Sequence, residues 1–271
     1  MRASRSCGVV ALCLAGSLMA AAVQAQSLRL GGTGSALGLL QQVGAEFAKA
    51  ADIKLDIVPA LGSAGAIRAL TDGVIDIAVS ARPLKADEVA AGLSQVTTLR
   101  TAYVLATSHR NPNALKSADL PRIFAVEKAV WADGGTIRII LRPRSEADTA
   151  LLGVLFPGMD AAIETARRRV EVPTAATDQD NVDLAERTPG SLIVTSATQL
   201  ATERPNLRML PLDGIAPTLA NFESGAYPFT KKLYVVVRAN GSPEARRFVD
   251  FLRSPQGVRA LRETETLPGV Q

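Results

Sequence analysis

Two short apolar runs near the start of the chain are each followed by small residues and then by a helical pattern. Leu28–Leu30 is expected to form a strand, and after the loop 31–35 the apolar side chains recur at helical spacing over Leu37–Ala50. Lys54–Val58 is expected to form the next strand, followed by the small residues 62–65. This repeated order of strand, loop and helix predicts an open α/β sheet with ligand loops at the carboxyl ends of its strands.

The stretch Leu61–Leu84 carries the clearest functional pattern. Its small-residue loop leads into an expected helix over Ala66–Asp72, a turn at Gly73, a buried strand over Val74–Val79 and a second polar loop. A small-residue loop that runs into a helix presents unpaired backbone N–H groups together with the positive end of the helix dipole. The pattern therefore indicates an oxyanion receptor.

The remainder of the chain continues the alternation of strands and helices. Strands are expected over Thr101–Ser108, Thr136–Leu141, Ser191–Thr195 and Leu233–Arg238, and helices over Leu120–Ala125, from near Thr149, over Pro243–Leu252 and after Pro255, with a further segment at Gln179–Glu186. We expect the first and last of these strands to be neighbouring crossings between two lobes. Residues 26–104 with 233–271 would form the first lobe, on which the C-terminal helix packs, and residues 105–232 the second.

The first 25 residues have the features of a cleaved signal peptide, with basic Arg2 and Arg5, an apolar run and a small-residue cleavage pattern. A membrane anchor is the alternative, but the short apolar core favours export to the periplasm. Both cysteines, Cys7 and Cys13, lie in this segment, so the mature chain would depend on an ordinary hydrophobic core. Its remaining positive charge is small and aromatic residues are 4% of the chain, which disfavours nucleic-acid binding.

Other kinds of site find little support in the residue pattern. The glycines of residues 31–38 have neither the G-x-G-x-x-G spacing nor a Gly-Lys-Ser/Thr ending, so dinucleotide and phosphate-loop sites are discarded. His109 is the only histidine and lies in a polar turn, where a solvent-exposed side chain is the ordinary case. Ser35, Ser63 and Ser80 have no companion base, so a hydrolase is poorly supported.

Two groups of charged residues in the second half of the chain have to be weighed. Asp178, Asp180 and Asp183 are spaced like a polar helix start rather than a calcium loop, and the counts of cysteine and histidine exclude a metal site built from those residues. The basic loop that begins at Arg142 follows an apolar strand and precedes a helix. An arginine there could bind an oxyanion through paired hydrogen bonds, and a solvated charged loop is the alternative.

Several motifs together resemble the phosphate-binding receptor family of bacterial ABC transporters. They are Gly31-Gly32-Thr33-Gly34-Ser35, Gly62-Ser63-Ala64-Gly65, Asp76-Ile77-Ala78-Val79-Ser80 with Arg82-Pro83-Leu84, Leu212-Asp213-Gly214-Ile215-Ala216-Pro217-Thr218, and Ser224-Gly225-Ala226-Tyr227-Pro228. That family commonly has an Asp-Gly-Val-x-Pro-Thr stretch followed by a Gly-x-Tyr-Pro segment. The resemblance covers nearly the whole mature chain.

The resemblance implies a two-lobed periplasmic-binding-protein fold, with a mixed α/β sheet in each lobe and a hinge between them. A monomer without cofactors or catalysis would capture phosphate or a similar small oxyanion and deliver it to an inner-membrane ABC permease. Closing the lobes would bury the anion among fixed donors. The implied ligand contacts are Gly34, Ser35, Ser63, Ala64, Ser80 and Arg82 from the first lobe and Arg142, Ser145 and Thr149 from the second.

Two positions depart from the family pattern. The best-known phosphate receptors have an aspartate after the strand-ending serine, where it accepts a proton of phosphate, but this chain has Ala81. The usual Ser-Gly-Thr loop is replaced by Ala147-Asp148-Thr149, so that Asp148 either caps a helix and excludes oxyanions or accepts from a protonated ligand. An enzyme on the same fold, for which Asp148 is the one candidate base, and a sensor or interaction protein derived from a receptor stay open as alternatives.

Ala81→Asp tests the alignment at the first departure. The new carboxylate would accept a hydrogen bond from protonated phosphate, which fully ionised sulfate cannot donate. We therefore expect the ratio of phosphate to sulfate affinity, measured by isothermal titration, to rise in this variant. An unchanged ratio would count against the alignment.

Overall fold

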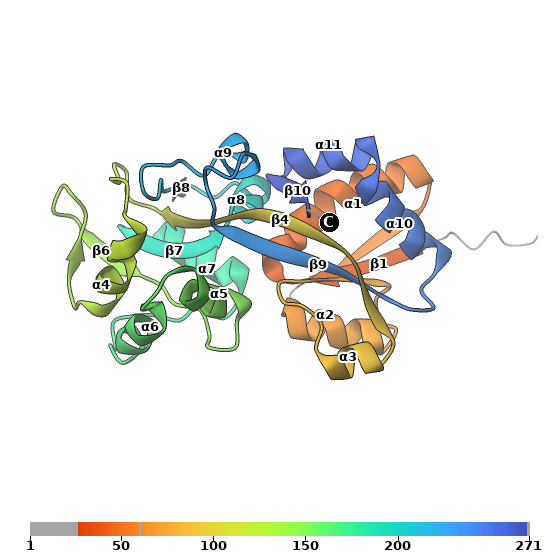
Figure 1. The fold of residues 1–271 in the computed structure, drawn as a ribbon, viewed down its shortest axis with the longest axis horizontal. Helices are drawn as coiled ribbons and strands as arrows, with labels where there is room; N and C mark the ends of the chain where they lie inside the picture. The colour runs from red at the N-terminus through yellow and green to blue at the C-terminus, as the bar shows by residue number, and fades with distance from the viewer. Residues whose placement is uncertain (1–26, 60, 270–271) are drawn as a thin grey trace, which may run out of the picture.

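The computed structural model describes residues 27–59 and 61–269, which form two lobes side by side (Figure 1). The expected signal peptide lies outside these residues. The strands are β1 (Ser27–Gly32), β2 (Lys54–Val58), β3 (Ile77–Ser80), β4 (Leu93–Thr107), β5 (Ala129–Val130), β6 (Thr136–Ile139), β7 (Ser191–Ser196), β8 (Arg208–Met209), β9 (Thr230–Arg238) and β10 (Thr266–Pro268). They form one mixed sheet in the order β2-β1-β3-β9-β4-β7-β6-β5, and β8 and β10 also pair with β4.

Helices cover the sheet in both lobes. In the first lobe they are α1 (Leu37–Ala51), α2 (Gly62–Thr71), α3 (Ala86–Ala90), α10 (Pro243–Arg253) and α11 (Pro255–Glu263); in the second they are α4 (Leu120–Ala125), α5 (Ala147–Leu155), α6 (Met159–Arg167), α7 (Asp178–Arg187), α8 (Ala197–Glu203) and α9 (Leu219–Glu223). Single 3-10 turns precede α1 and α4, at Gly34–Ala36 and Ser117–Asp119. This is the two-lobed α/β fold expected from the sequence.

The long strands β4 and β9 connect the lobes. They pair antiparallel from Leu93 opposite Arg238 to Ala102 opposite Thr230, and β4 then pairs with β7 from Tyr103 onward. Strand β4 therefore pairs with strands of both lobes within one continuous sheet, and the expectation that these two crossings are neighbours is confirmed. The residue boundaries assigned to the lobes stay a prediction.

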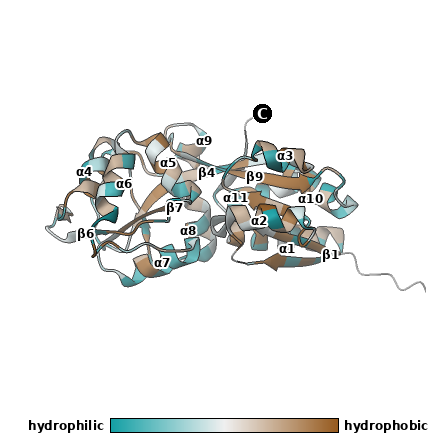
Figure 2. Ribbon diagram, turned by 90° about the horizontal axis from the view of Figure 1, so that it is seen from below, coloured by the Kyte–Doolittle hydropathy of each residue, from teal (hydrophilic) through white to brown (hydrophobic). Residues whose placement is uncertain are grey.

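Each lobe has its own hydrophobic core. In the first, the ring of Phe47 on α1 meets those of Phe248 and Phe251 on α10 at centroid distances of 5.1 and 5.5 Å, so the C-terminal helix packs on the first lobe as expected. The second core surrounds Tyr103 and Trp131, which are both about 1% exposed. In Figure 2 the central strands of the first lobe, β1 and β9, are coloured mainly as apolar.

The prediction of a loop at residues 62–65 is wrong, because these residues form the first turn of α2. Serine and alanine are acceptable at a helix start, and Gly62 supplies the positive φ of 64° with which this helix begins. The following strand starts at Ile77 rather than at Val74, because the backbone N–H of Val74 donates to the carbonyl of Ala69 and so continues the helix-ending turn.

Other differences concern elements that the apolar pattern did not reveal. Strand β4 begins at Leu93, well before the expected Thr101. Its first half was not predicted, because that half is only partly buried and carries polar side chains. Helix α6 was missed although it buries Met159, Ile163 and Ala166 on one face. Helix α8 was also missed, since it follows β7 without any intervening loop and is capped by the last residue of that strand.

Phe47→Ala tests the first core. Removing a fully buried ring leaves a cavity, so we expect the free energy of unfolding, measured by urea titration, to fall by about 3–5 kcal/mol. Val170→Ala is the control, because Val170 is fully exposed and its loss should change that free energy by less than about 0.5 kcal/mol. Equal effects of the two substitutions would contradict the assigned core.

Candidate functional site

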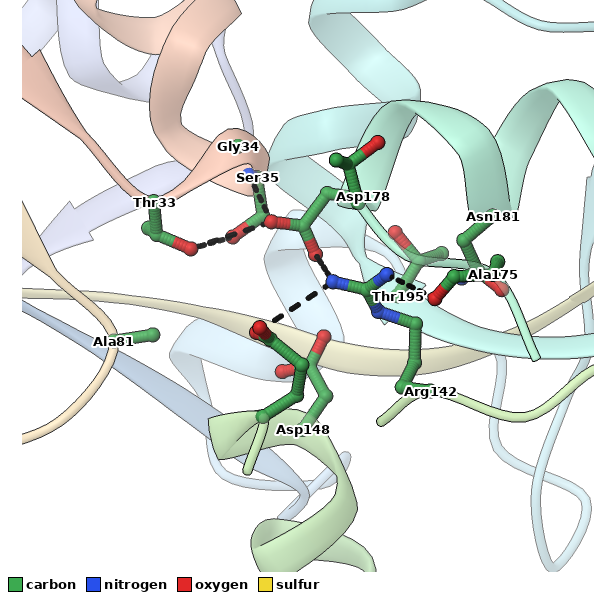
Figure 3. Close-up of polar contacts among 12 residues, drawn as sticks. Thr33, Gly34, Ser35, Ala81, Arg142, Asp148, Ala175, Asp178, Asn181 and Thr195 are labelled. Carbon is green, nitrogen blue, oxygen red and sulfur yellow. Dashed lines mark hydrogen bonds and ion pairs between the residues drawn. The ribbon is translucent and has the colours of Figure 1, made fainter. Parts of the chain in front are cut away.

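Donors at the end of β1 converge on a carboxylate from the other lobe. The backbone N–H of Ser35 donates to Oδ2 of Asp178 at 2.9 Å, and the hydroxyl of Thr33 donates to the same oxygen at 3.3 Å. Both donors lie in the turn that leads into α1, whose N-terminus has no side-chain cap. The turn before that helix therefore uses an acidic side chain from far along the chain (Figure 3).

Arg142 approaches the same carboxylate from the second lobe. Its guanidinium is buried and donates to the carbonyl of Ala175 at 2.7 Å and to Oδ1 of Asp178 at 3.3 Å. Glu146 adds a more distant ion pair at 3.5 Å. One oxygen of Asp178 thus faces the first lobe and the other faces Arg142, as Figure 3 shows. The arrangement satisfies a buried carboxylate with charged and neutral donors.

Local structure holds Asp178 in this position. It is the first residue of α7, and the preceding Thr177 caps that helix by accepting from the N–H of Asp180. The side chain of Gln199 donates to the backbone carbonyl of Asp178 at 3.1 Å. Oxygen atoms of Asp178 and the N-terminus of α1 can meet because position 34 is glycine, where a Cβ would lie only 2.7 Å from Oδ2 of Asp178.

A second buried ion pair lies beside the first. Nζ of Lys231 on β9 is 2.6 Å from Oδ1 of Asp148, and both side chains are almost fully buried. Burial raises the pKa of Asp148, against the opposing effect of the nearby Lys231 charge. The hydroxyl of Tyr103 donates to the backbone carbonyl of Asp148 at 2.8 Å. Asp148 does not cap α5, because the N-cap position is Glu146, so the first of the two alternatives given for Asp148 is wrong.

The remaining first-lobe residues of the expected site bond mainly to one another. Oγ of Ser63 accepts from the N–H of Ala81 at 2.9 Å, whereas Oγ of Ser80 accepts from the N–H of Arg82 and donates to its carbonyl at 2.7 Å. Ala64 is exposed on the first turn of α2. These contacts join the start of α2 to the loop after β3.

The guanidinium of Arg82 is engaged by a carboxylate of its own lobe. It makes two hydrogen bonds to Glu88, at 2.8 and 2.6 Å, and it lowers the pKa of that carboxyl to about 2. This paired geometry is the strong form of an arginine and carboxylate contact. The structure therefore gives Arg82 a partner on α3.

Ser145 and Thr149 of the second lobe differ in their surroundings. Ser145 is exposed in the loop before α5. The hydroxyl of Thr149 donates to the carbonyl of Pro143 at 2.9 Å and lies 3.3 Å from that of Arg142. Thr149 thereby stabilises the loop that carries Arg142.

The structure thus brings Gly34, Ser35 and Arg142 together from the expected site. Sequence reasoning missed the roles of Asp178 and Lys231. A helix start explains why Asp178 is acidic, but nothing in the local pattern indicates a partner in the other lobe. Lys231 lies two residues before the expected strand Leu233–Arg238, and its place within β9 became evident only from the structure.

A cavity of about 360 Å³ lies between the lobes next to the buried ion pair. Its walls come from the loop after β3, from α5 and from β9; among the lining residues are Ala81, Arg82, Asp148, Leu151, Lys231 and Tyr234. The cavity has charged groups at its wall and space for a small solute, but Ser35, Arg142 and Asp178 are not among its lining residues.

Other chemistry receives no support from the described part of the chain. His109 stacks on Trp131 at 5.1 Å and pairs with Asp133 at 2.9 Å, in the second lobe. No group of three histidine, cysteine or acidic residues suited to a metal ion occurs among residues 27–59 and 61–269. Across those same residues, every helix is too short or too polar to span a bilayer.

Comparisons with known proteins concern the family and the fold. A family model described as the PBP superfamily domain matches residues 19–256. A search among curated proteins finds no match. Among solved structures, a candidate phosphate ABC transporter substrate-binding protein from Clostridium perfringens, with bound phosphate, is 18% identical with a TM-score of 0.74, over 90% of this chain and 100% of that chain.

Two further solved structures illustrate what the fold accommodates. An ABC-type phosphate transport receptor from Vibrio cholerae is 16% identical with a TM-score of 0.61, over 89% of this chain and 99% of that chain. The effector-binding domain of QuiR in complex with shikimate is 13% identical with a TM-score of 0.56, over 89% of this chain and 98% of that chain. At these identities the similarity is one of fold.

Lys231→Met tests the buried ion pair. The substitution leaves Asp148 buried without its counter-charge, so we expect the free energy of unfolding to fall by about 3–5 kcal/mol in urea titrations. The double variant Asp148→Asn with Lys231→Met should recover most of that loss, because no uncompensated charge remains. Simple addition of the two single effects would show that the side chains are not coupled.

Proposed function

The chain belongs to the PBP superfamily, and on that premise we propose that it is a solute-binding protein for a small oxyanion, with phosphate as the preferred ligand. The observation that carries the proposal is the convergence of donors from two lobes on one carboxylate. The N–H of Ser35 and the hydroxyl of Thr33 come from the first lobe, and Arg142 comes from the second. Donors so arranged suit an anionic oxygen.

The proposed ligand contacts combine backbone and side-chain donors. Gly34 and Ser35 lie in the 3-10 turn before α1, and Ser63 and Ala64 lie in the first turn of α2, where helical N–H groups favour an anion. Arg142 would supply the positive charge. The further proposed contacts, to be examined by substitution, are Ser80, Arg82, Ser145 and Thr149.

Ligand binding would link the lobes, because the proposed donors come from both of them. The strands β4 and β9 cross between the lobes. A ligand that contacts the donors of both lobes would stabilise the closed arrangement, because it makes its full set of bonds only there. This is a binding function without a chemical step.

Transport is the proposed role of this binding. The neighbours from Clostridium perfringens and Vibrio cholerae are described as proteins of phosphate ABC transport. We propose export by a cleaved signal peptide within residues 1–25, action as a monomer in the periplasm, and delivery of the solute to an inner-membrane ABC permease.

A ligand-sensing role is the second candidate. It is favoured by the similarity in fold to an effector-binding domain that binds the carboxylate shikimate. It is also favoured by Asp178, a carboxylate that already contacts the candidate donors. An enzyme has less support, because the one candidate base, Asp148, is paired with Lys231.

The decisive experiment is a thermal-shift and calorimetric screen of the protein from residue 26 onward. The ligands are phosphate, sulfate, molybdate, tungstate, phosphonates and shikimate. One oxyanion at about one hundred times its dissociation constant should stabilise the fold by about 2.7 kcal/mol. Stabilisation by shikimate alone would favour the sensor, and no response to any oxyanion would contradict the receptor.

Arg142→Ala should abolish the stabilisation by the oxyanion, because it removes the buried cation of the site. Arg144→Ala is the matched control, since Arg144 lies two residues away, is exposed and pairs with Glu164. It should bind the oxyanion as the wild type does. Equal loss of binding in both variants would argue for a general effect of charge rather than for the proposed contact.

A further inference from the structure

We propose that Asp178 is a built-in ligand of the oxyanion donors, which closes the two lobes on each other and competes with the solute. The competition rests on the proposed function, whereas the closing contact can be tested without any solute. Asp178 would then determine which anions the site accepts and how tightly it binds them. Four observations lead to this inference.

First, Asp178 holds the donors that the solute is proposed to use. Its Oδ2 atom accepts from Ser35 and Thr33, and its Oδ1 atom accepts from Arg142. A carboxylate presents two anionic oxygens much as one edge of a tetrahedral oxyanion does. Both cannot occupy the same hydrogen-bonding positions, so an incoming oxyanion must displace the carboxylate from at least some of these donors.

Second, the carboxylate already compensates the buried positive charge. Arg142 is 3% exposed and Asp178 is 6% exposed, so their attraction is little weakened by water. The neighbouring cation Lys231 is likewise occupied by Asp148 at 2.6 Å. A dianion that entered beside these carboxylates would be repelled by them. Displacement of Asp178 removes the nearest repulsion and frees Arg142.

Third, the contact of Asp178 with the first lobe is accompanied by close packing of the two backbones. The side chain of Gln179, next to Asp178, donates to the backbone carbonyl of Gly34 at 3.0 Å. A Cβ at position 34 would lie 2.6 Å from Oε1 of Gln179, so the backbone of the first lobe lies directly against the start of α7. Contact this close leaves no room for a solute between the N-terminus of α1 and the start of α7.

Fourth, a similar close contact occurs in the first turn of α1. Gly38 faces Thr202 on α8, and a Cβ at position 38 would clash with the threonine side chain. Helices α1 and α8 therefore pack closely across the lobe boundary. The lobes are held together by contacts of the chain itself. Asp178 supplies the buried charged contact among them, and the exposed pair of Arg262 on α11 with Glu223 on α9 supplies another.

Isothermal titration with phosphate tests the competition. Asp178→Asn keeps the shape but removes the charge, and Asp178→Ala removes the competing oxygens. We expect the dissociation constant for phosphate to fall at least tenfold in both variants. Asp183→Asn is the matched control, because it makes the same charge change at an exposed site of the same helix, and it should bind phosphate as the wild type does.

Two results of that titration would overturn the competition. An unchanged dissociation constant in both variants would mean that Asp178 does not hinder the ligand. Weaker binding in both would mean that the carboxylate instead positions Arg142 for the ligand. Circular dichroism of each variant shows whether it is folded. Two substitutions of different severity guard against a result due to misfolding of one of them.

Small-angle X-ray scattering without added solute tests the closing contact. We expect the wild type and Asp183→Asn to share one compact radius of gyration, and Asp178→Ala to show a larger one that decreases with phosphate. Equal radii for all three proteins without solute would overturn the closing role. If neither the wild type nor any variant binds an oxyanion, the proposed function and the competition fail, and scattering alone still decides whether Asp178 closes the lobes.

Discussion

A charge buried between two lobes has to be matched by groups from both of them, and this requirement shapes the centre of the molecule. Asp178 meets it with donors of the first lobe on one oxygen and with Arg142 on the other. Loss of either set would leave one buried oxygen of this charge without a partner, which costs more than an ordinary hydrogen bond contributes. The glycine at position 34, the cap at Thr177 and the bond from Gln199 are all arranged around this one carboxylate.

The second buried pair gives the same region an internal charge balance. Asp148 and Lys231 compensate each other, as Asp178 and Arg142 do, and Glu146 is a further partner of Arg142, so the basic groups of the region are matched within the chain. A receptor that relied on an unpaired arginine would instead have a net positive charge at this place. The departure from the family pattern at Asp148 places one of these acidic groups on α5, where Lys231 compensates it.

Local patterns were sufficient for many elements and insufficient for the site. Strand Lys54–Val58 and helix Leu120–Ala125 have the bounds expected from their apolar spacing. Helix α2 starts earlier than expected, because small residues are compatible with both a loop and a helical turn. Asp178 was assigned to a helix start, which is correct, but its bond to Ser35 joins residues 143 positions apart and depends on how two lobes pack. No local periodicity contains that information.

The insertion of the second lobe within the first has a consequence for the order of folding. The second core draws almost all of its residues from one continuous stretch, Ala102 to Tyr227, and is nearly complete once that stretch has emerged during synthesis. The first core needs Phe248 and Leu261 from the end of the chain to cover α1. The N-terminal segment is synthesised first, but the apolar face of α1 therefore stays uncovered until the C-terminal helices have been made. Chaperones that hold nascent or exported chains would find their binding surface there, on α1 around Phe47.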